Sequence, residues 1–284
     1  MEGGTENVTE RKKFVLVTGA GGGMGKATVK LLLSEGYYVF ALDKSVINLQ
    51  NSLRLNEQES SRLNVLECDV SDNSSVLRCA ETVKKTTTKL FAIIHFAGVY
   101  TLDSLIEIPP EEFEKIFKIN VFGAFYINEA FVPSLRENGR IITVTSELAT
   151  LAPLPFTGLY GVTKGALDNY AHSLKMELQL KGIYVSVLRA GAVKTGMLGA
   201  STAALDKFCE KTKNYSVSAE RFRKIVNAVE SKCVTPELLA QKTLKILHAK
   251  KPKFAYSINR NFLLKLYGIA PSKIKFYAVK KILK

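Results

Sequence analysis

Tyr160 and Lys164 are the residues of this 284-residue chain whose types and spacing best suit proton transfer. The residues after Tyr160 place apolar side chains at three- and four-residue intervals, which predicts a helix with one buried face. Side chains four positions apart lie on the same helix face and can meet. A free tyrosine has a pKa of roughly 10, and a lysine cation beside it lowers that pKa. The pair therefore indicates a general acid or base, although such a pair alone also occurs by chance.

The elements that must position this pair begin with a strand, a glycine-rich turn and a helix. Residues 14–17 form a short apolar run, residues 19–25 read Gly-Ala-Gly-Gly-Gly-Met-Gly, and a helical pattern follows. Glycines allow the backbone to approach a pyrophosphate closely, and a helix N-terminus supplies free N–H groups to it. This arrangement predicts a dinucleotide site, whereas the same glycines without flanking elements would indicate a flexible linker.

Asp43 ends the second predicted strand, residues 37–42, and stands 18 positions beyond Gly25. A carboxylate there accepts hydrogen bonds from the adenosine ribose and repels a 2′-phosphate, which favours NAD(H) over NADP(H). The neighbouring Lys44 weakens this preference for NAD(H), because its positive charge could attract a 2′-phosphate. A turn residue that simply closes the strand is the alternative interpretation of Asp43.

The rest of the chain continues to alternate strands and helices. Ser146 follows the fifth predicted strand, at the sheet edge where ligands bind in open α/β folds. Asn120 lies on the apolar face of a long predicted helix, where its amide needs hydrogen-bond partners. The alternation predicts an α/β fold with a doubly wound parallel sheet. Beyond the first two strands, further strands are predicted at residues 63–68, 90–96, 140–145, 184–188 and 254–257.

Together these residues resemble the short-chain dehydrogenase/reductase superfamily over residues 12–257. The resemblance implies a single Rossmann-type domain with about seven parallel strands and helices on both faces. It also implies nicotinamide-dependent interconversion of an alcohol and a ketone. It rests on an ordered set of residues, namely the turn from Thr18 to Gly25, Asp43, Asp69, Asn120, Ser146, Tyr160-x-x-x-Lys164 and Gly191-x-x-x-Thr195.

The resemblance also implies a role for each matched residue. Tyr160 would be the general acid/base, and Ser146 would hold the substrate oxygen. Lys164 would bind the nicotinamide ribose and lower the pKa of Tyr160, and Asn120 would place a water molecule that links Lys164 to solvent. Asp69 would contact the adenine amino group, and the nicotinamide carboxamide would contact Val193 and Thr195. The remaining cofactor contacts would come from Gly19, Gly23, Met24, Gly25, Asp43, Val70, Ala97 and Gly98.

Two positions depart from the usual family pattern. His95-Phe96-Ala97-Gly98 stands where the family usually has Asn-Asn-Ala-Gly, and Ala190-Gly191 replaces the usual Pro-Gly. Neither change removes a reacting group. We interpret His95 as a strand-end histidine, with a catalytic role as the alternative.

Charge and composition suggest how the chain is divided. We expect a flexible tail at residues 1–12, a catalytic domain at residues 13–258 with a substrate lid at about residues 192–236, and a C-terminal extension at residues 259–284. Twelve of the 40 basic residues and none of the 26 acidic ones lie beyond residue 237. The body is therefore nearly neutral, and most of the net charge of +14 lies at the C-terminal end.

The C-terminal extension includes a predicted amphipathic helix at residues 272–284, with its lysines in one sector. Such a helix suits the surface of an anionic membrane, and docking on the body or on another subunit is the alternative. No apolar run reaches the roughly 18 residues of a spanning helix, and the first residues lack the apolar centre of a signal peptide. We therefore expect a cytoplasmic protein, with peripheral contact to a membrane surface through this tail.

The favoured function is an NAD(H)-dependent oxidoreductase acting on a lipophilic secondary alcohol or ketone, such as a steroid, a retinoid or another lipid. The resemblance suggests this substrate class, because relatives with apolar C-terminal extensions often act on lipids, and it suggests a homodimer or homotetramer. Two alternatives remain open: an NADPH-dependent 3-oxoacyl-carrier-protein reductase and a non-catalytic dinucleotide-binding scaffold. We expect no metal site and no nucleic-acid partner.

Overall fold

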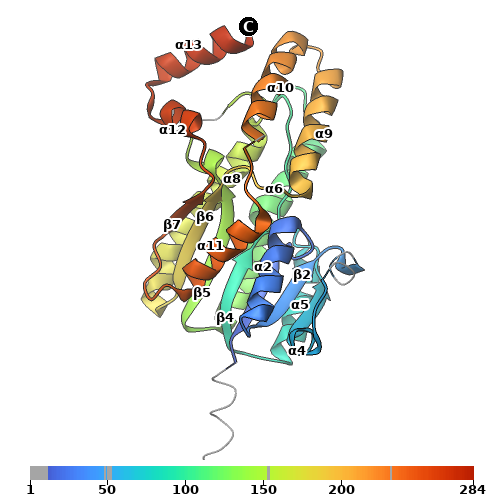
Figure 1. The fold of residues 1–284 in the computed structure, drawn as a ribbon, viewed down its shortest axis with the longest axis vertical. Coiled ribbons are helices and arrows are strands. Elements are labelled where there is room, and N and C mark those ends of the chain that lie inside the picture. The colour runs from blue at the N-terminus through green and yellow to red at the C-terminus, as the bar shows by residue number, and fades with distance from the viewer. Residues whose placement is uncertain (1–11, 48, 50–52, 152–153, 231) are drawn as a thin grey trace, which may run out of the picture.

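Seven parallel strands form the centre of the computed structural model, which describes residues 12–47, 49, 53–151, 154–230 and 232–284 (Figure 1). Their order in the sheet is β3-β2-β1-β4-β5-β6-β7, which confirms the doubly wound α/β prediction. The order reverses between β1 and β4, the point where such folds bind ligands. The strands are β1 (Phe14–Thr18), β2 (Tyr38–Asp43), β3 (Leu63–Glu67), β4 (Leu90–His95), β5 (Leu135–Ser146), β6 (Tyr184–Ala190) and β7 (Ala255–Ile258).

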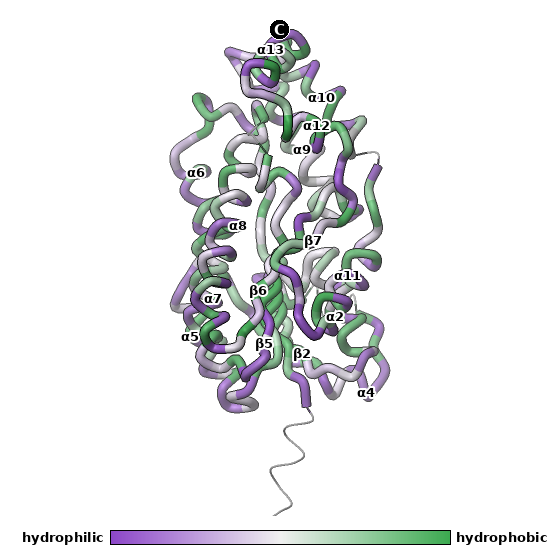
Figure 2. The backbone as a smooth tube through the Cα atoms, turned by 90° about the vertical axis from the view of Figure 1, so that its left-hand side faces the viewer, coloured by the Kyte–Doolittle hydropathy of each residue, from purple (hydrophilic) through white to green (hydrophobic). Residues whose placement is uncertain are grey.

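Helices cover both faces of the sheet, as the view along its edge shows (Figure 2). On one face lie α2 (Gly23–Ser34) and α11 (Pro236–His248), and on the other lie α5 (Asn73–Lys84), α7 (Gly123–Phe131) and α8 (Gly158–Leu178). Each face of the sheet forms a separate hydrophobic core with its helices. Leu32 and Leu247 belong to the core on the first face, and Phe131 and Leu178 belong to the core on the second face. The inner strands are therefore buried on both sides, which is why their sequences are continuous apolar runs. A short helix, α4 (Glu57–Ser60), lies outside this pattern.

The fifth strand is longer than the predicted run of residues 140–145. It begins at Leu135, and its pairing with β4 shifts register between Leu135 and Arg140. Within the shift, Asn138 has a φ of 59°, in the left-handed region that asparagine tolerates better than most residues. Asn138 and Gly139, which lie before the predicted run, therefore form an irregularity inside the strand. The other end agrees with the prediction, because the strand delivers Ser146 to the edge of the sheet.

The long helix predicted after residue 110 is interrupted. It consists of α6 (Pro110–Phe117), a π-helical turn (Lys118–Phe122) and α7. Asn120 is at the centre of the π turn and is 1% exposed. Such turns insert one extra residue into a helix and change the direction of the side chains they carry.

Four more helices lie beyond the carboxyl ends of the strands (Figure 1). In the predicted lid, α9 (Gly196–Lys211) and α10 (Ser216–Glu230) pack against each other. In the C-terminal extension, α12 (Phe262–Ile269) is followed by α13 (Ser272–Leu283), which packs on the lid through Val279 and Leu283. The predicted 1–12 tail lies outside the described residues except for Lys12. None of the described helices is long and apolar enough to cross a bilayer.

Candidate active site

Ser146 and Tyr160 meet where β5 ends and α8 begins. Both side chains are buried and line the same pocket, where the Ser146 hydroxyl is near enough to affect the phenol of Tyr160. The Ser146 Oγ also accepts the Leu148 N–H at 3.2 Å, which fixes the serine at the start of a short turn. The ring of Tyr100 lies 4.8 Å from that of Tyr160, measured between centroids, and covers it on one side. The predicted pair of hydroxyl groups is thus assembled at the carboxyl edge of the sheet.

Lys164 lies one helical turn beyond Tyr160, on the same face of α8. Its Nζ is 5.8 Å from the centroid of the Tyr160 ring and donates to the Val144 carbonyl oxygen at 3.3 Å. Burial in an apolar surrounding disfavours the ammonium form and lowers the pKa of Lys164 to about 8.

The pKa of Tyr160 differs from the sequence prediction. We expected Lys164 to lower it, but burial raises it above the ordinary value, and the neighbouring Tyr100 adds to that rise. The Ser146 hydroxyl opposes the increase without cancelling it. The physical reason is that burial deprives the phenolate of its hydration and so disfavours the charged form.

The side-chain amide of Asn120 makes three hydrogen bonds. Its Oδ1 accepts the Val99 N–H at 2.8 Å, and its Nδ2 donates to the Val99 carbonyl oxygen at 2.9 Å and to the Thr163 hydroxyl at 3.1 Å. A Cβ placed on Gly98 would lie 3.1 Å from the Asn120 Oδ1 and 3.3 Å from the Lys164 Nζ. The absence of a side chain at Gly98 therefore lets Asn120 and Lys164 approach each other across it.

The position of α8 is fixed by a buried carboxylate farther along the helix. Asp168 accepts hydrogen bonds from the Thr145 hydroxyl at 3.0 Å and from the Arg189 guanidinium at 3.0 and 2.7 Å. Thr145 belongs to β5 and Arg189 to β6, so the hydrogen bond from Thr145 ties the helix that carries Tyr160 to the strand that carries Ser146, and the ion pair ties it to β6.

The glycine-rich turn runs against the ends of β1 and β4. Gly19 has a φ of +64°, and a Cβ there would lie 2.5 Å from the Ala97 nitrogen. A Cβ on Gly25 would collide with the Gly19 carbonyl, and one on Gly23 would lie 2.8 Å from the Thr195 Cγ2. The turn leads into the N-terminus of α2, whose first N–H groups are available to an anion. These residues leave a helix N-terminus and a side-chain-free turn that would fit a pyrophosphate, and their contacts with a cofactor stay a prediction.

Asp43 contacts the same turn from β2. Its carboxylate accepts the Gly21 N–H at 2.8 Å and the Ser45 N–H at 3.0 Å. A Cβ on Gly21 would come within 3.0 Å of that carboxylate. The acid expected to bind the ribose is therefore part of the wall beside the pyrophosphate turn.

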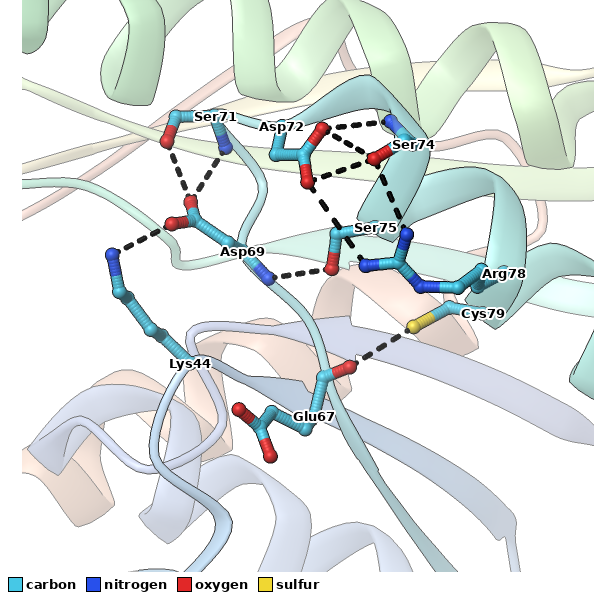
Figure 3. Close-up of polar contacts among 9 residues, drawn as sticks. All are labelled: Lys44, Glu67, Asp69, Ser71, Asp72, Ser74, Ser75, Arg78 and Cys79. Atoms are coloured by element: carbon cyan, nitrogen blue, oxygen red, sulfur yellow. Dashed lines mark hydrogen bonds and ion pairs between the residues drawn. The ribbon is translucent and has the colours of Figure 1, made fainter.

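Asp69 and Lys44 form an ion pair at the end of β3 (Figure 3). The Lys44 Nζ lies 2.6 Å from the Asp69 Oδ2, and Oδ1 accepts the N–H and the hydroxyl of Ser71 at 2.9 and 2.6 Å. Burial alone would raise the pKa of Asp69, but the hydrogen bonds from Lys44 and Ser71 hold it below its usual value. Lys44 is thus directed at Asp69, the residue expected to contact adenine. Next to it, Val70 packs against Gly123.

A pocket of about 200 Å³ opens beside the two hydroxyl groups. Ser146, Tyr160 and Lys164 line one side of it, and the predicted cofactor residues Met24, Val193 and Thr195 also line it. Most of the remaining wall is apolar and comes from the sheet edge, the lid and α12: Phe96, Leu148, Leu154, Met197, Phe222, Ile225, Val226 and Leu264.

Other predicted residues lie outside the pocket wall. Asn120, Asp43 and Asp69 make the contacts described above, and His95 is buried at the end of β4 with its Nε2 2.9 Å from the Asn128 Oδ1. Burial lowers the pKa of His95 to about 4. The position of His95 at the strand end agrees with the sequence interpretation.

The sequence reasoning missed four residues at the site. The Tyr100 ring packs against that of Tyr160 at a tilt of 53°, Thr163 accepts a hydrogen bond from Asn120, and both Glu147 and Leu264 line the pocket. Glu147 could have been noticed, because it follows Ser146 directly at the predicted ligand edge. Leu264 could not, because nothing in the spacing brings residue 264 back to the strand ends.

Comparisons with known proteins agree with this geometry. The family model described as short chain dehydrogenase matches residues 13–206. A protein from Ornithobacterium rhinotracheale named NADPH-dependent 3-dehydrocapnine reductase is 26% identical over 94% of this chain and 91% of its own length. Estradiol 17-beta-dehydrogenase 2 from Mus musculus is 34% identical over 66% of this chain and 50% of its own length.

A third relative is the NADPH-dependent 1-acyldihydroxyacetone phosphate reductase of Schizosaccharomyces pombe, 32% identical over 66% of this chain and 62% of its own length. Among solved structures, a short-chain dehydrogenase/reductase from Burkholderia phymatum in complex with NAD has a TM-score of 0.75 at 21% identity. That match covers 94% of this chain and 95% of the other, and it shows the same fold.

Proposed function

The chain belongs to the short-chain dehydrogenase family and is an NAD(P)-dependent oxidoreductase, and from this premise we propose that it interconverts a secondary alcohol and a ketone on a lipophilic substrate with NAD(H). The observation that carries the proposal is that Ser146 and Tyr160 stand together on the wall of a mainly apolar pocket.

The proposed roles are those that the family resemblance implies, and the positions of Ser146, Tyr160 and Lys164 on one pocket wall support them. In the reducing direction, Ser146 donates a hydrogen bond to the ketone oxygen and Tyr160 donates the proton that this oxygen gains. The raised pKa of Tyr160 keeps the phenol protonated for this step. Lys164 binds the nicotinamide ribose, and Asn120 positions a water molecule near Lys164 that replaces the proton. Bound cofactor supplies or accepts the hydride.

NAD(H) is the proposed cofactor because of Asp43. Its carboxylate lies beside the glycine-rich turn, where it can accept hydrogen bonds from ribose hydroxyl groups and repel a 2′-phosphate. Lys44, the base that could attract such a phosphate, is paired with Asp69. Two of the relatives are named NADPH-dependent, so the choice between the cofactors is the part of the proposal to test first.

The substrate class follows from the pocket wall and from the relatives. Aliphatic and aromatic side chains from the sheet edge, the lid and α12 favour an apolar molecule. One relative is named for estradiol and another for an acyl-bearing compound. We therefore assign a steroid-like, retinoid-like or long-chain substrate rather than a small polar one.

We also propose that the C-terminal extension contacts an anionic membrane surface. One group of side chains, here called the α12–α13 face, is exposed although it is apolar, and no acidic residue occurs from residue 238 onward to offset its lysines. Apolar side chains surrounded by lysines suit the boundary between lipid headgroups and acyl chains. The α12–α13 face comprises Phe262, Leu263, Leu266, Ile269, Ile274, Phe276, Tyr277 and Ile282.

For assembly we propose a homodimer or homotetramer. Aromatic side chains on α6, the π turn and α7 support this, because Phe113, Phe122 and Phe125 are 40–48% exposed and gather on one continuous helical segment. Exposed aromatic residues of this kind are enriched in subunit interfaces.

Titration with NADH and NADPH, followed by assays on lipophilic ketones, tests the proposed function. We expect tighter binding of NADH and cofactor-dependent reduction. Preference for NADPH would favour a 3-oxoacyl-carrier-protein reductase, and cofactor binding without turnover of any ketone would favour a scaffold.

A further inference from the structure

Glu147 is a buried carboxyl group on the wall of the pocket. It follows Ser146 directly and is 6% exposed. Among the described residues that line the pocket, it is the one acidic side chain, and Lys164 is the one basic side chain. A carboxyl group in such an apolar wall is costly unless a partner compensates it.

The contacts of Glu147 leave room for a further partner. Its Oε2 accepts the N–H of Asn261, the residue that caps α12, at 2.8 Å. Its Oε1 lies on the side of Gly191, where a Cβ would come within 3.1 Å of it. Both Gly191 and Glu147 line the pocket. Burial raises the pKa of Glu147, and the Asn261 N–H and the charge of Arg260 oppose that rise, although no ion pair within 4.0 Å among the described residues includes Glu147. A carboxylate has about four acceptor sites, so one backbone hydrogen bond does not saturate it.

Glu147 lines the same pocket as the reacting hydroxyl groups of Ser146 and Tyr160. Ser146 holds the substrate oxygen in the proposed function, and Glu147 is its neighbour in the chain on the same pocket wall. The substituents on the carbon beside the carbonyl are therefore the part of a substrate that Glu147 can reach. In a surrounding of low dielectric, a carboxylate attracts a cation there strongly and repels an anion equally.

We propose that Glu147 selects substrates that carry a protonated amine on the carbon next to the reacting alcohol or ketone, within an otherwise long and apolar molecule. This inference rests on the proposed function and specifies its substrate class as a lipophilic amino alcohol or amino ketone. The ammonium group donates to Glu147 while the neighbouring oxygen binds Ser146 and Tyr160. Substrates with a phosphate or carboxylate at that carbon are disfavoured.

Two alcohols of equal chain length test the inference, namely 1-amino-2-dodecanol and 1,2-dodecanediol, which differ in the ammonium group alone. Oxidation with NAD⁺ at pH 7.5 gives kcat/KM for each, and calorimetry with the protein and cofactor gives each Kd. We expect the amino alcohol to be preferred at least tenfold, mainly through KM and Kd.

The informative variant is Glu147→Gln, which keeps the side-chain volume and an oxygen for the Asn261 N–H but removes the charge. We expect the ratio between the two alcohols to fall at least tenfold, because a charged hydrogen bond is replaced by a neutral one. Using the ratio within one variant cancels any general loss of activity. The same substitution at Glu177, exposed on α8, is the matched control and should leave the ratio unchanged.

The outcomes distinguish a failure of the inference about Glu147 from a failure of the proposed function. If Glu147 only anchors α12, the variant affects both alcohols equally and the ratio stays constant, which overturns the inference while the oxidoreductase function stands. A wild-type protein that prefers the diol would likewise overturn the inference about Glu147 and leave the oxidoreductase function standing. A protein that neither binds nor oxidises either alcohol would contradict the lipophilic substrate class and this inference together.

Discussion

At the scale of single residues, the environment of Tyr160 favours proton donation over proton abstraction. The phenol is buried, its pKa is raised, and the lysine one turn away lies 5.8 Å from its ring centroid. A protonated Tyr160 suits the reduction of a ketone as it stands. The oxidation of an alcohol needs the phenolate, so it should be favoured by higher pH.

The first expected result concerns Tyr160→Phe, which removes the hydroxyl and keeps the ring packed against Tyr100. Turnover should fall by about 10²-fold or more, the usual contribution of general acid–base catalysis, while the Kd for NADH changes little. Steady-state assays and fluorescence titration measure the two quantities. Unchanged turnover would refute the role assigned to Tyr160.

His95 should make the protein sensitive to acid. The buried imidazole stays neutral in the folded chain down to a pKa of about 4, whereas the unfolded chain protonates it near 6.5. The unfolded state therefore binds the extra proton, and stability is lost as pH falls from 6.5 to 4, by about 3 kcal/mol at most.

Urea unfolding at several pH values measures this loss, with His95→Asn as the comparison because it removes the titrating group. We expect the wild type to lose more stability than the variant between pH 6.5 and 4. Parallel curves for the two proteins would show that His95 does not contribute.

At the scale of elements, most strand positions were predictable and several helix details were not. Strands of a sheet covered on both faces are continuous apolar runs, so their sequence pattern survives without tertiary information. The π turn at Asn120 is invisible to periodicity, because the extra residue in the helix is held by contacts with Val99 and Thr163, far away in sequence.

The candidate site likewise contains residues that could be identified from the sequence and contacts that could not. Asn120, Ser146, Tyr160 and Lys164 could be identified because their order along the chain is characteristic. The contact between Glu147 and the Asn261 N–H joins residues 114 positions apart, and no spacing rule reveals it. The sequence also predicted a lowered pKa for Tyr160, whereas burial raises it. The extent of burial can be judged only once the neighbouring elements are in place.

The prediction at this scale concerns the α12–α13 face. Replacing Phe262 and Leu263, which are 68% and 71% exposed, with serine should weaken binding to phosphatidylserine vesicles at least tenfold. Co-sedimentation measures the effect. Replacing Ile106 and Leu180, which are 72% and 85% exposed on the body, is the matched control. Equal sedimentation of all three proteins would contradict membrane contact through α12.

At the scale of the whole molecule, six of the basic residues of the C-terminal region, the lysines of α12 and α13 and the final Lys284, lie at the same end as the pocket. The α12 and α13 helices, with the lysines that follow residue 260, stand beyond the carboxyl edge of the sheet together with the lid (Figure 1). An anionic surface would therefore attract the end of the molecule that holds the pocket. Added salt should weaken that attraction.

Cofactor binding should stabilise the whole fold, because the glycine-rich turn and β2 contribute to one site. NADH at 100 times its Kd adds about 2.7 kcal/mol, which for a chain of this size raises the Tm by roughly 5 °C. NADPH at the same concentration should raise it less. Asp43→Asn should reduce the difference between the cofactors by removing the charge that opposes the 2′-phosphate.

The control for this measurement is Lys44→Gln, which breaks the ion pair with Asp69. If Lys44 does not bind a phosphate, the order of the two cofactors stays the same in this variant. A larger thermal shift with NADPH in the wild type would contradict the assignment of Asp43.

Leu264 has a consequence for the kinetics. It lines the pocket, while its neighbours Phe262 and Leu263 in the same helix face outward. A substrate dissolved in a bilayer would meet α12 before it met water, so the rate would follow its mole fraction in the lipid rather than its bulk concentration. Diluting the substrate with inert lipid at constant total amount would then slow the reaction, whereas diluting the whole suspension with buffer would change it little once the enzyme is bound.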